Sequence, residues 1–258
     1  MPEVDSYIHR KTMLYKTGVE YGDYTMNFVQ GCSHGCKFPC YAFLQKKRFV
    51  QVADYEDWCK PRLVSNTLAL LDKEIPRLKD RIKSVQLCFS TDPFMHGYQD
   101  IADMAVASIR KLNAAGIKCT VLTKAILPMT LAQLSENNEY GITLISLDES
   151  YREKMEPGAA PYAERLNALM KLHEAGCKTW ISMEPYPTPN LIAQDLQSLL
   201  ESVSFVDNII FGRTNYSKKA SAYKEHKDFY NKRAAEVIDF CETHGILYHI
   251  KEKTITEG

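Results

Sequence analysis

The chain has 258 residues, of which 45% are hydrophobic and 25% charged, and its 32 basic residues balance its 32 acidic ones. This composition is typical of a globular protein with a sizeable core, and the absence of net charge argues against nucleic acid as a partner without excluding it. The first residues lack a basic segment followed by an apolar one, and no apolar run is long enough to cross a bilayer, so we expect a cytoplasmic protein without a membrane partner.

Short β-rich segments alternate with amphipathic helical segments from Tyr24 onward, which predicts repeated βα units around a parallel sheet. The predicted strands are 24–31, 84–90, 118–123, 142–147, 178–183 and 208–212, with a weaker one at 246–250. Helical apolar spacing recurs at 101–112, 161–175 and 192–203. About six units are fewer than the eight of a closed barrel. We therefore predict an α/β fold with a partial, open, TIM-barrel-like parallel barrel.

The same pattern predicts a single domain over residues 1–258. Its core would span about 24–215, and residues 216–258 would add a C-terminal helix and the last strand.

Three of the eight cysteines, Cys32, Cys36 and Cys40, lie close together after the first predicted strand. A structural zinc site needs four closed ligands, whereas three thiolates can hold three irons of a four-iron cluster and leave the fourth iron open. His34 could complete a closed zinc site, although such sites usually combine two separated ligand pairs and no second pair occurs here. We expect a catalytic metal centre and keep a zinc-stabilised, non-enzymatic binding module as the alternative.

Polar residues follow the next predicted strands as well. Ser90, Thr91 and Asp92 end the second strand, and Thr123 and Lys124 end the third. Parallel α/β folds bind ligands at the carboxyl ends of their strands. These segments and the cysteine loop are therefore predicted to share one rim of the sheet.

The pattern of the cysteine loop resembles the radical S-adenosylmethionine superfamily, and within it the branch around spore photoproduct lyase. The shared residues of the loop are Asn27, Gly31-Cys32, His34, Gly35-Cys36 and Cys40-Tyr41. Further matching segments follow in the expected order up to about residue 215: Ser90-Thr91-Asp92-Pro93-Phe94, Leu122-Thr123-Lys124, Glu156-Pro157-Gly158-Ala159 with Arg165-Leu166, and Ser182-Met183-Glu184-Pro185. The spacing departs from the family, because this chain reads CxxxCxxxC where the family has CxxxCxxC. Either Phe38 or Tyr41 could therefore be the aromatic residue near the adenine.

The resemblance implies a 4Fe–4S cluster on Cys32, Cys36 and Cys40, with S-adenosylmethionine on the open iron. Reductive cleavage of this cofactor would give a 5′-deoxyadenosyl radical that removes hydrogen from an unidentified substrate, and the electron would come from a donor such as a flavodoxin or ferredoxin. Besides Tyr41, a candidate near the adenine, the cofactor contacts implied are Ser90 and Thr91 at the methionine amino end, Lys124 at the carboxylate and Ser146, on the fourth strand, at the ribose. A local turn or a solvated rim position stays the alternative for the Ser, Thr and Lys residues.

Cys88 resembles, through Cys88-Phe89-Ser90, the thiol that returns a hydrogen atom to the substrate radical in spore photoproduct lyase. Strand alternation would point Cys88 and Ser90 into the barrel together, while inert packing is the alternative for this thiol. The resemblance also raises DNA photoproduct repair as a second function. The balanced charge opposes it, because phosphate contacts need cations.

Overall fold

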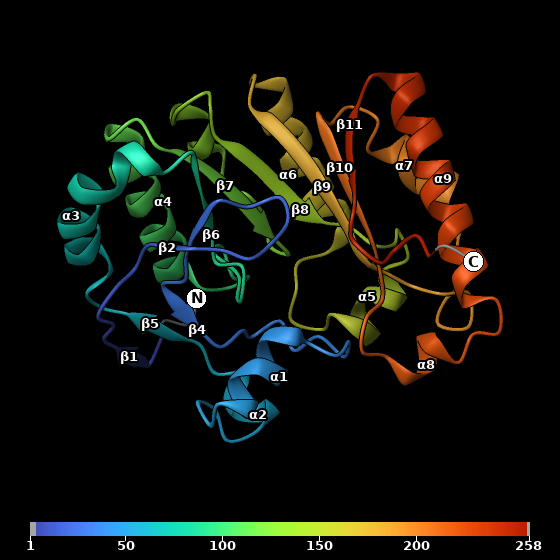
Figure 1. The fold of residues 1–258 in the computed structure, drawn as a ribbon, viewed down its shortest axis with the longest axis horizontal. Helices are drawn as coiled ribbons and strands as arrows, with labels where there is room; N and C mark the ends of the chain where they lie inside the picture. The colour runs from blue at the N-terminus through green and yellow to red at the C-terminus, as the bar shows by residue number, and fades with distance from the viewer. Residues whose placement is uncertain (1–3, 257–258) are drawn as a thin grey trace.

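The computed structural model describes residues 4–256, which form a curved sheet covered by helices on its outer side (Figure 1). The main sheet has 8 strands in the order β11-β10-β9-β8-β7-β6-β3-β2. Its strands are β2 (Tyr15–Lys16), β3 (Tyr24–Met26), β6 (Ser84–Leu87), β7 (Lys118–Thr123), β8 (Glu139–Thr143), β9 (Lys178–Tyr186), β10 (Asn208–Arg213) and β11 (Leu247–Ile250). Every pairing from β3 to β11 is parallel, and only the edge strand β2 is antiparallel. The predicted α/β fold with a parallel sheet is confirmed.

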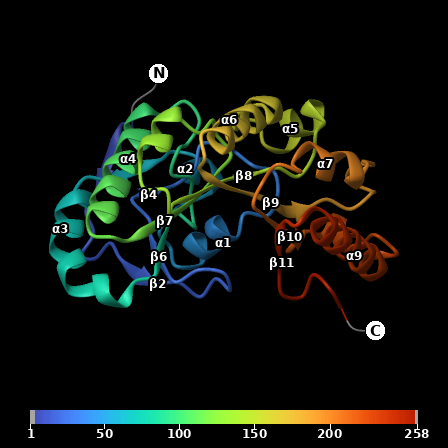
Figure 2. The same cartoon turned by 90° about the horizontal axis from the view of Figure 1, so that it is seen from above.

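The helices fall into two groups by position. Viewed from above, the first group forms an arc around the outer face of the sheet (Figure 2): α3 (Thr67–Leu78), α4 (Gln99–Ala114), α6 (Tyr162–Glu174), α7 (Leu196–Ser202) and α9 (His226–His244). The second group lies at the lower end of the sheet in Figure 1: α1 (Tyr41–Arg48), α2 (Tyr55–Trp58), α5 (Glu149–Met155) and α8 (Lys218–Ser221). No helix within residues 4–256 is both long and apolar enough to span a bilayer.

Helix boundaries follow the local chemistry of the sequence. Helix α6 begins directly after Pro161, and Gly176, with φ of +85°, follows its last turn. The apolar stripe predicted on α4 is the buried side of that helix, with Ile101, Ile109 and Leu112 each 0% exposed.

Several predicted strands have different bounds in the structure; β9, for example, runs three residues beyond the predicted end at 183, and three other differences bear on the site. The segment 24–31 is broken, because β4 (Val29–Gln30) leaves the main sheet and pairs with β5 (Arg62–Val64) in a small sheet of order β1-β5-β4, whose outer strand is β1 (Ser6–Ile8). Strand β6 ends at Leu87 rather than at residue 90, because Cys88 has a left-handed φ of 52°. Strand β8 covers 139–143 rather than 142–147, because the apolar run continues after the strand as buried loop residues Leu144 and Ile145.

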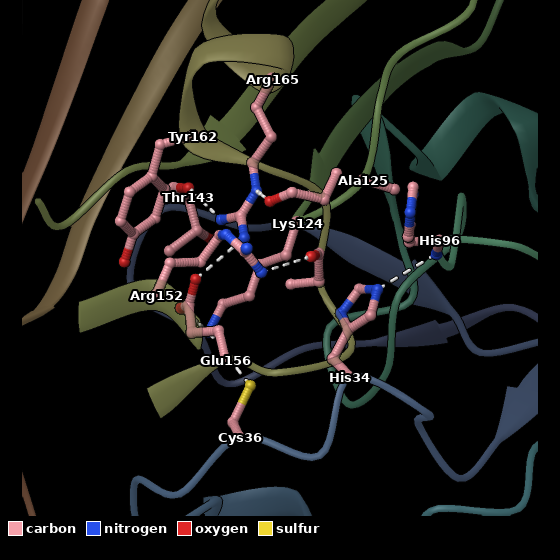
Figure 3. A network of polar contacts seen from close by, with 12 residues as sticks. His34, Cys36, His96, Lys124, Ala125, Thr143, Arg152, Glu156, Tyr162 and Arg165 are labelled. Atoms are coloured by element: carbon pink, nitrogen blue, oxygen red, sulfur yellow. Dashed lines mark hydrogen bonds and ion pairs between the residues drawn. The ribbon is translucent and has the colours of Figure 1, made fainter. Parts of the chain in front are cut away.

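Arg165 of α6 is 0% exposed and joins three parts of the fold (Figure 3). Its guanidinium donates to the Thr143 carbonyl at 3.0 Å, at the end of β8, and to the Ala160 carbonyl at 2.8 Å. It also pairs at 3.0 Å with Glu156, whose side chain is likewise 0% exposed. Helix α6, strand β8 and the loop between α5 and α6 are therefore fixed together by one buried cation.

We predict that Arg165→Met lowers the free energy of unfolding by about 3–5 kcal/mol, because it leaves a buried carboxylate without this partner. Urea unfolding followed by circular dichroism measures the change. Arg77→Met is the matched control on the exposed side of α3, and its effect should stay within about 0.5 kcal/mol. Equal midpoints for the two variants would contradict the structural role of Arg165.

Candidate functional site

A cavity of about 440 Å³ lies at the carboxyl ends of the parallel strands. Its lining includes the cysteine loop, the segment after β6, the end of β7 and the ends of β9 and β10. The predicted site residues that line it are Cys32, Cys36, Cys40, Tyr41, Cys88, Ser90, Thr91 and Lys124. The expectation that these separate segments meet at one rim agrees with this geometry.

The cysteine loop is held between two other loops. Gly31 has φ of +90°, and a Cβ there would lie 2.7 Å from the carbonyl oxygens of Trp58 and Lys60, so the close approach requires glycine. On this side Cys32 donates its N–H to the Trp58 carbonyl at 2.8 Å. On the other side the Gly158 N–H donates to the His34 carbonyl at 2.9 Å, and a Cβ on Gly158 would lie 2.4 Å from the Ser33 carbonyl oxygen.

The three thiols of this loop form a donor set suited to a cluster. Cys32, Cys36 and Cys40 are all unpaired and partly exposed. Burial, the neighbouring Cys36 thiol and Asp92 raise the pKa of Cys32, while burial raises that of Cys36 against the opposing effect of Lys124. Among residues 4–256, no three His, Cys, Asp or Glu side chains are placed to hold a single metal ion. A four-iron cluster binds its thiolates on different irons, so this donor set fits a cluster better than one ion.

His34 is not free to act as a zinc ligand in this arrangement. Its Nε2 accepts the His96 N–H at 3.1 Å, and its Nδ1 lies 3.6 Å from a carboxylate oxygen of Asp92 (Figure 3 draws the contact with His96). Burial lowers the pKa of His34 to about 4, so the ring is neutral at pH 7. Nε2 is therefore occupied by a backbone N–H and Nδ1 faces the Asp92 carboxylate, which disfavours the closed site of three cysteines and one histidine.

Asn27 positions the segment after β6. Its Oδ1 accepts the N–H of Ser90 at 3.0 Å and the hydroxyl of Ser90 at 2.7 Å. The Thr91 hydroxyl donates to the Val29 carbonyl at 3.3 Å. Ser90 and Thr91 are thus fixed against the strand that precedes the cysteine loop, at the edge of the cavity.

Asp92 links this segment to the end of β7. One carboxylate oxygen accepts the Thr123 hydroxyl at 2.6 Å and the Phe94 N–H at 2.9 Å, and the other accepts the Lys124 N–H at 2.7 Å. The side chain is buried and these partners satisfy it. Asp92 is therefore a structural anchor for the two loops that face the cysteines.

Lys124 extends into the cavity toward the cysteine loop (Figure 3). Its Nζ lies 2.6 Å from Oε1 of Glu156 and 3.5 Å from Sγ of Cys36. Burial alone would lower the pKa of Lys124, but Cys36 and Glu156 raise it above the ordinary lysine value. The side chain is therefore a charged ammonium beside a thiol of the predicted cluster site.

Tyr41 and Ser146 differ in how they relate to the cavity. Tyr41 begins α1, lines the cavity and donates its hydroxyl to the Phe89 carbonyl. Ser146 lies three residues beyond β8, accepts the Asp148 N–H at 3.1 Å and is not among the lining residues. Placing it on the fourth strand was wrong because the strand ends earlier. The hydroxyl residues that line the cavity from β8 and β9 are Thr143 and Ser182.

Cys88 lies just after β6 and is 2% exposed. The argument from strand alternation was wrong for this residue, because its φ of 52° places it outside the strand. The thiol nevertheless lines the cavity. Burial raises the pKa of Cys88 to about 12, against the opposing hydrogen bonds of Thr91 and of backbone N–H groups, so Cys88 remains a protonated thiol at neutral pH.

The far side of the cavity contains residues that the sequence analysis missed. Lys251 follows β11, and its Nζ lies 2.8 Å from Glu184 of β9, while Arg213 ends β10 and donates to Asn215 at 3.0 Å. Tyr21 lines the same region and packs edge to face on His249 with ring centroids 5.6 Å apart. For Arg213 the sequence did contain a signal, because it is a charged residue at the carboxyl end of a strand. Lys251 and Tyr21 reach the cavity only because segments distant in sequence fold together.

Known proteins resemble this chain in sequence and in fold. A family model described as the Radical SAM superfamily matches residues 26–203. The uncharacterized protein ORF301 of Acidianus two-tailed virus is 29% identical over 199 residues. That match covers 72% of this chain and 64% of the viral protein, so the chain spans less than two thirds of this relative's length.

Solved structures share the fold at low sequence identity. Spore photoproduct lyase complexed with dinucleoside spore photoproduct is 15% identical, with a TM-score of 0.68 over 95% of this chain and 81% of that chain. A spore photoproduct lyase mutant with bound AdoMet and the same dinucleoside has a TM-score of 0.65 at 15% identity, over 95% of this chain and 80% of that one. SuiB from Streptococcus suis is 20% identical, with a TM-score of 0.52 over 71% of this chain and 43% of that chain. The predicted partial-barrel fold is confirmed by this similarity.

The matched segment 26–203 spans most of the chain, and it contains the cysteine loop, the polar ends of β6 and β7, and the Glu156 loop that line or support one cavity. The chain therefore belongs to the radical SAM superfamily.

Proposed function

We propose that the protein binds a 4Fe–4S cluster through Cys32, Cys36 and Cys40 and binds S-adenosylmethionine beside it. When bound, the two groups would supply reductive carbon–sulfur cleavage and a 5′-deoxyadenosyl radical that removes hydrogen from an unidentified substrate. The observation that supports this most directly is that all three thiols line one cavity of about 440 Å³ together with Ser90 and Lys124.

The remaining residues of the cavity would bind and orient the cofactor. Ser90 and Thr91, fixed by Asn27 and Val29, are the candidates for the methionine amino end. Phe38 and Tyr41 both line the cavity and remain alternatives for the contact with the adenine. For the ribose, the cavity offers the hydroxyls of Thr143 and Ser182, whereas Ser146 would have to move to reach it.

An electron donor such as a flavodoxin or ferredoxin would approach near α1. This helix follows Cys40 directly and has Lys46, Lys47 and Arg48 in its last turn. No carboxylate pairs with these three cations among the described ion pairs. An acidic donor surface would therefore find complementary charge beside the proposed cluster.

The cysteine substitutions test the proposal directly. We expect Cys32→Ala, Cys36→Ala and Cys40→Ala each to lose bound iron and sulfide after anaerobic reconstitution, and to lose 5′-deoxyadenosine formation by at least about 100-fold, since loss of even an outer-shell partner of a metal ligand typically costs about 10–100-fold. Cys177→Ala is the matched control, because Cys177 is a partly exposed thiol outside the cavity. A wild-type protein that holds zinc but no iron, or that never forms 5′-deoxyadenosine, would disprove the proposal.

Gly158 tests whether the Glu156 loop supports the cysteine loop. A Cβ at this position would lie 2.4 Å from the Ser33 carbonyl oxygen, so we expect Gly158→Ala to displace the cysteine loop. The iron retained per chain should fall by about half or more, which corresponds to a loss on the order of RT in the free energy of cluster binding. Gly18→Ala is the control, since nothing lies within 4 Å of a Cβ there. Iron and sulfide assays after desalting give the comparison. Undiminished iron in Gly158→Ala would show that the close contact is not needed for cluster binding.

DNA photoproduct repair is a second candidate, supported by the fold shared with spore photoproduct lyase over 95% of the chain and by the buried Cys88 thiol in the cavity. A protonated thiol is the form that can return a hydrogen atom to a substrate radical. The balanced charge of the chain still opposes binding to a polyanion.

Ultraviolet-irradiated DNA separates the two candidates. If the protein is a repair lyase, we expect wild-type enzyme to convert the photoproduct back to thymine residues in the DNA, and Cys88→Ala to do so at least about tenfold more slowly, equivalent to 1.4 kcal/mol or more. Formation of 5′-deoxyadenosine should continue in this variant. Cys119→Ala is the control for a buried thiol that does not line the cavity. An active wild-type enzyme that leaves the photoproduct unchanged would eliminate this candidate.

A further inference from the structure

Lys124 makes two contacts that set it apart from the other cations of the cavity (Figure 3). Its Nζ is 2.6 Å from the Glu156 carboxylate and 3.5 Å from the sulfur of Cys36. The other cavity lysine, Lys251, pairs with Glu184 at 2.8 Å and makes no hydrogen bond to a thiol of the described residues. Lys124 is thus the cation placed to act on a cysteine of the proposed cluster site.

The position of this ammonium is fixed from several sides. The Lys124 N–H donates to Asp92 at 2.7 Å, and the Lys124 carbonyl accepts the Ala160 N–H at 3.0 Å. The ammonium also lies 5.4 Å from the centre of the Phe38 ring, and the side chain is only 18% exposed. A side chain held in this way cannot turn away from Cys36 without breaking its ion pair with the buried Glu156.

The charges around Glu156 do not cancel. Its carboxylate is shared by Arg165 at 3.0 Å and Lys124 at 2.6 Å, so the three side chains together carry one excess positive charge. Arg165 and Glu156 are 0% exposed, and solvent therefore screens this charge poorly. Of the two cations, Lys124 is the one that faces Cys36.

We propose that Lys124, positioned by Glu156, donates an N–H to the Cys36 thiolate and raises the reduction potential of the cluster. The proposal rests on the proposed function, because it requires a cluster on Cys36. Reduction adds one electron to the cluster. A fixed cation and an N–H···S hydrogen bond stabilise that added negative charge more than they stabilise the oxidised state. This role differs from the contact with the cofactor carboxylate that the family resemblance implies for Lys124.

The test is a potentiometric titration of the anaerobically reconstituted protein, followed by electron paramagnetic resonance in the absence of S-adenosylmethionine. Lys124→Met removes the charge and the N–H donor while leaving the Arg165–Glu156 pair intact. At the wild-type midpoint, we expect its ratio of reduced to oxidised cluster to fall about tenfold, the change that corresponds to 59 mV for one electron. Lys124→Arg should keep most of the reduced population.

Lys251→Met is the matched control, because it removes the same charge from the same cavity without a thiol contact. Its midpoint should stay at the wild-type value. A midpoint for Lys124→Met equal to that of Lys251→Met would overturn the proposal. This holds even if Lys124→Met weakens the binding of S-adenosylmethionine, because such a variant would show only a cofactor contact. If Lys124→Met fails to retain a cluster, the titration is repeated with Lys124→Gln. A midpoint of Lys124→Gln equal to that of Lys251→Met would likewise overturn the proposal.

Glu156 is tested by a double-mutant comparison. If this carboxylate positions the lysine, Lys124→Met should shift the midpoint less in the Glu156→Gln background than in the wild-type background. Equal shifts would remove Glu156 from the proposal. Iron and labile sulfide are measured for every variant, and a wild-type protein that cannot hold a four-iron cluster would disprove the proposed function before any midpoint is compared.

Discussion

The buried carboxylate of Glu156 connects the fold to the site. On one side it accepts a hydrogen bond from Arg165, which also joins the end of β8 to the first turns of α6. On the other side it forms an ion pair with Lys124, which follows β7 and lies beside Cys36. Burying a carboxylate without partners costs folding free energy, so the fold keeps both cations beside Glu156. The packing of α6 and the position of an ammonium near the cysteine loop depend on one side chain.

The loop that contains Glu156 adds a steric constraint to this electrostatic one. Gly158 approaches the Ser33 carbonyl so closely that no side chain would fit, and its N–H holds the His34 carbonyl. The opposite side of the cysteine loop rests on the Trp58 carbonyl through Cys32. The three thiols are thus presented by a loop supported on both sides, which reduces the conformational freedom that cluster binding would otherwise have to remove.

Much of this half of the site could be predicted from the sequence, because its parts are contiguous motifs at the ends of strands. The cysteine loop, Ser90-Thr91 and Lys124 each follow a β-rich segment, and a parallel sheet brings such ends to one rim. The strand bounds were less predictable. Apolar residues continue beyond the last paired residue of β8, so hydrophobicity did not mark the end of the strand, and Ser146 was placed on it wrongly.

Cys88 shows a related difficulty. A strand pattern extends through residue 90, yet the backbone turns at Cys88, where its N–H donates to the Met26 carbonyl at 2.7 Å and φ becomes positive. The thiol reaches the cavity by this turn and not by strand alternation. Backbone conformation of this kind in a residue other than glycine depends on its surroundings, and single-residue propensity does not indicate it.

The opposite half of the cavity is built from contacts between segments distant in sequence. The Glu252 N–H donates to the Glu20 carboxylate at 3.0 Å, so the loop before β3 is fastened to the residues after β11 across the open side of the sheet. Lys251 is paired there with Glu184, whereas Lys124 near the thiols shares Glu156 with Arg165. The Lys251–Glu184 pair is therefore neutral as a whole, while the group around Glu156 keeps one positive charge. The net charge beside the cysteine loop is thus set by the Glu156 group and not by the far end of the cavity.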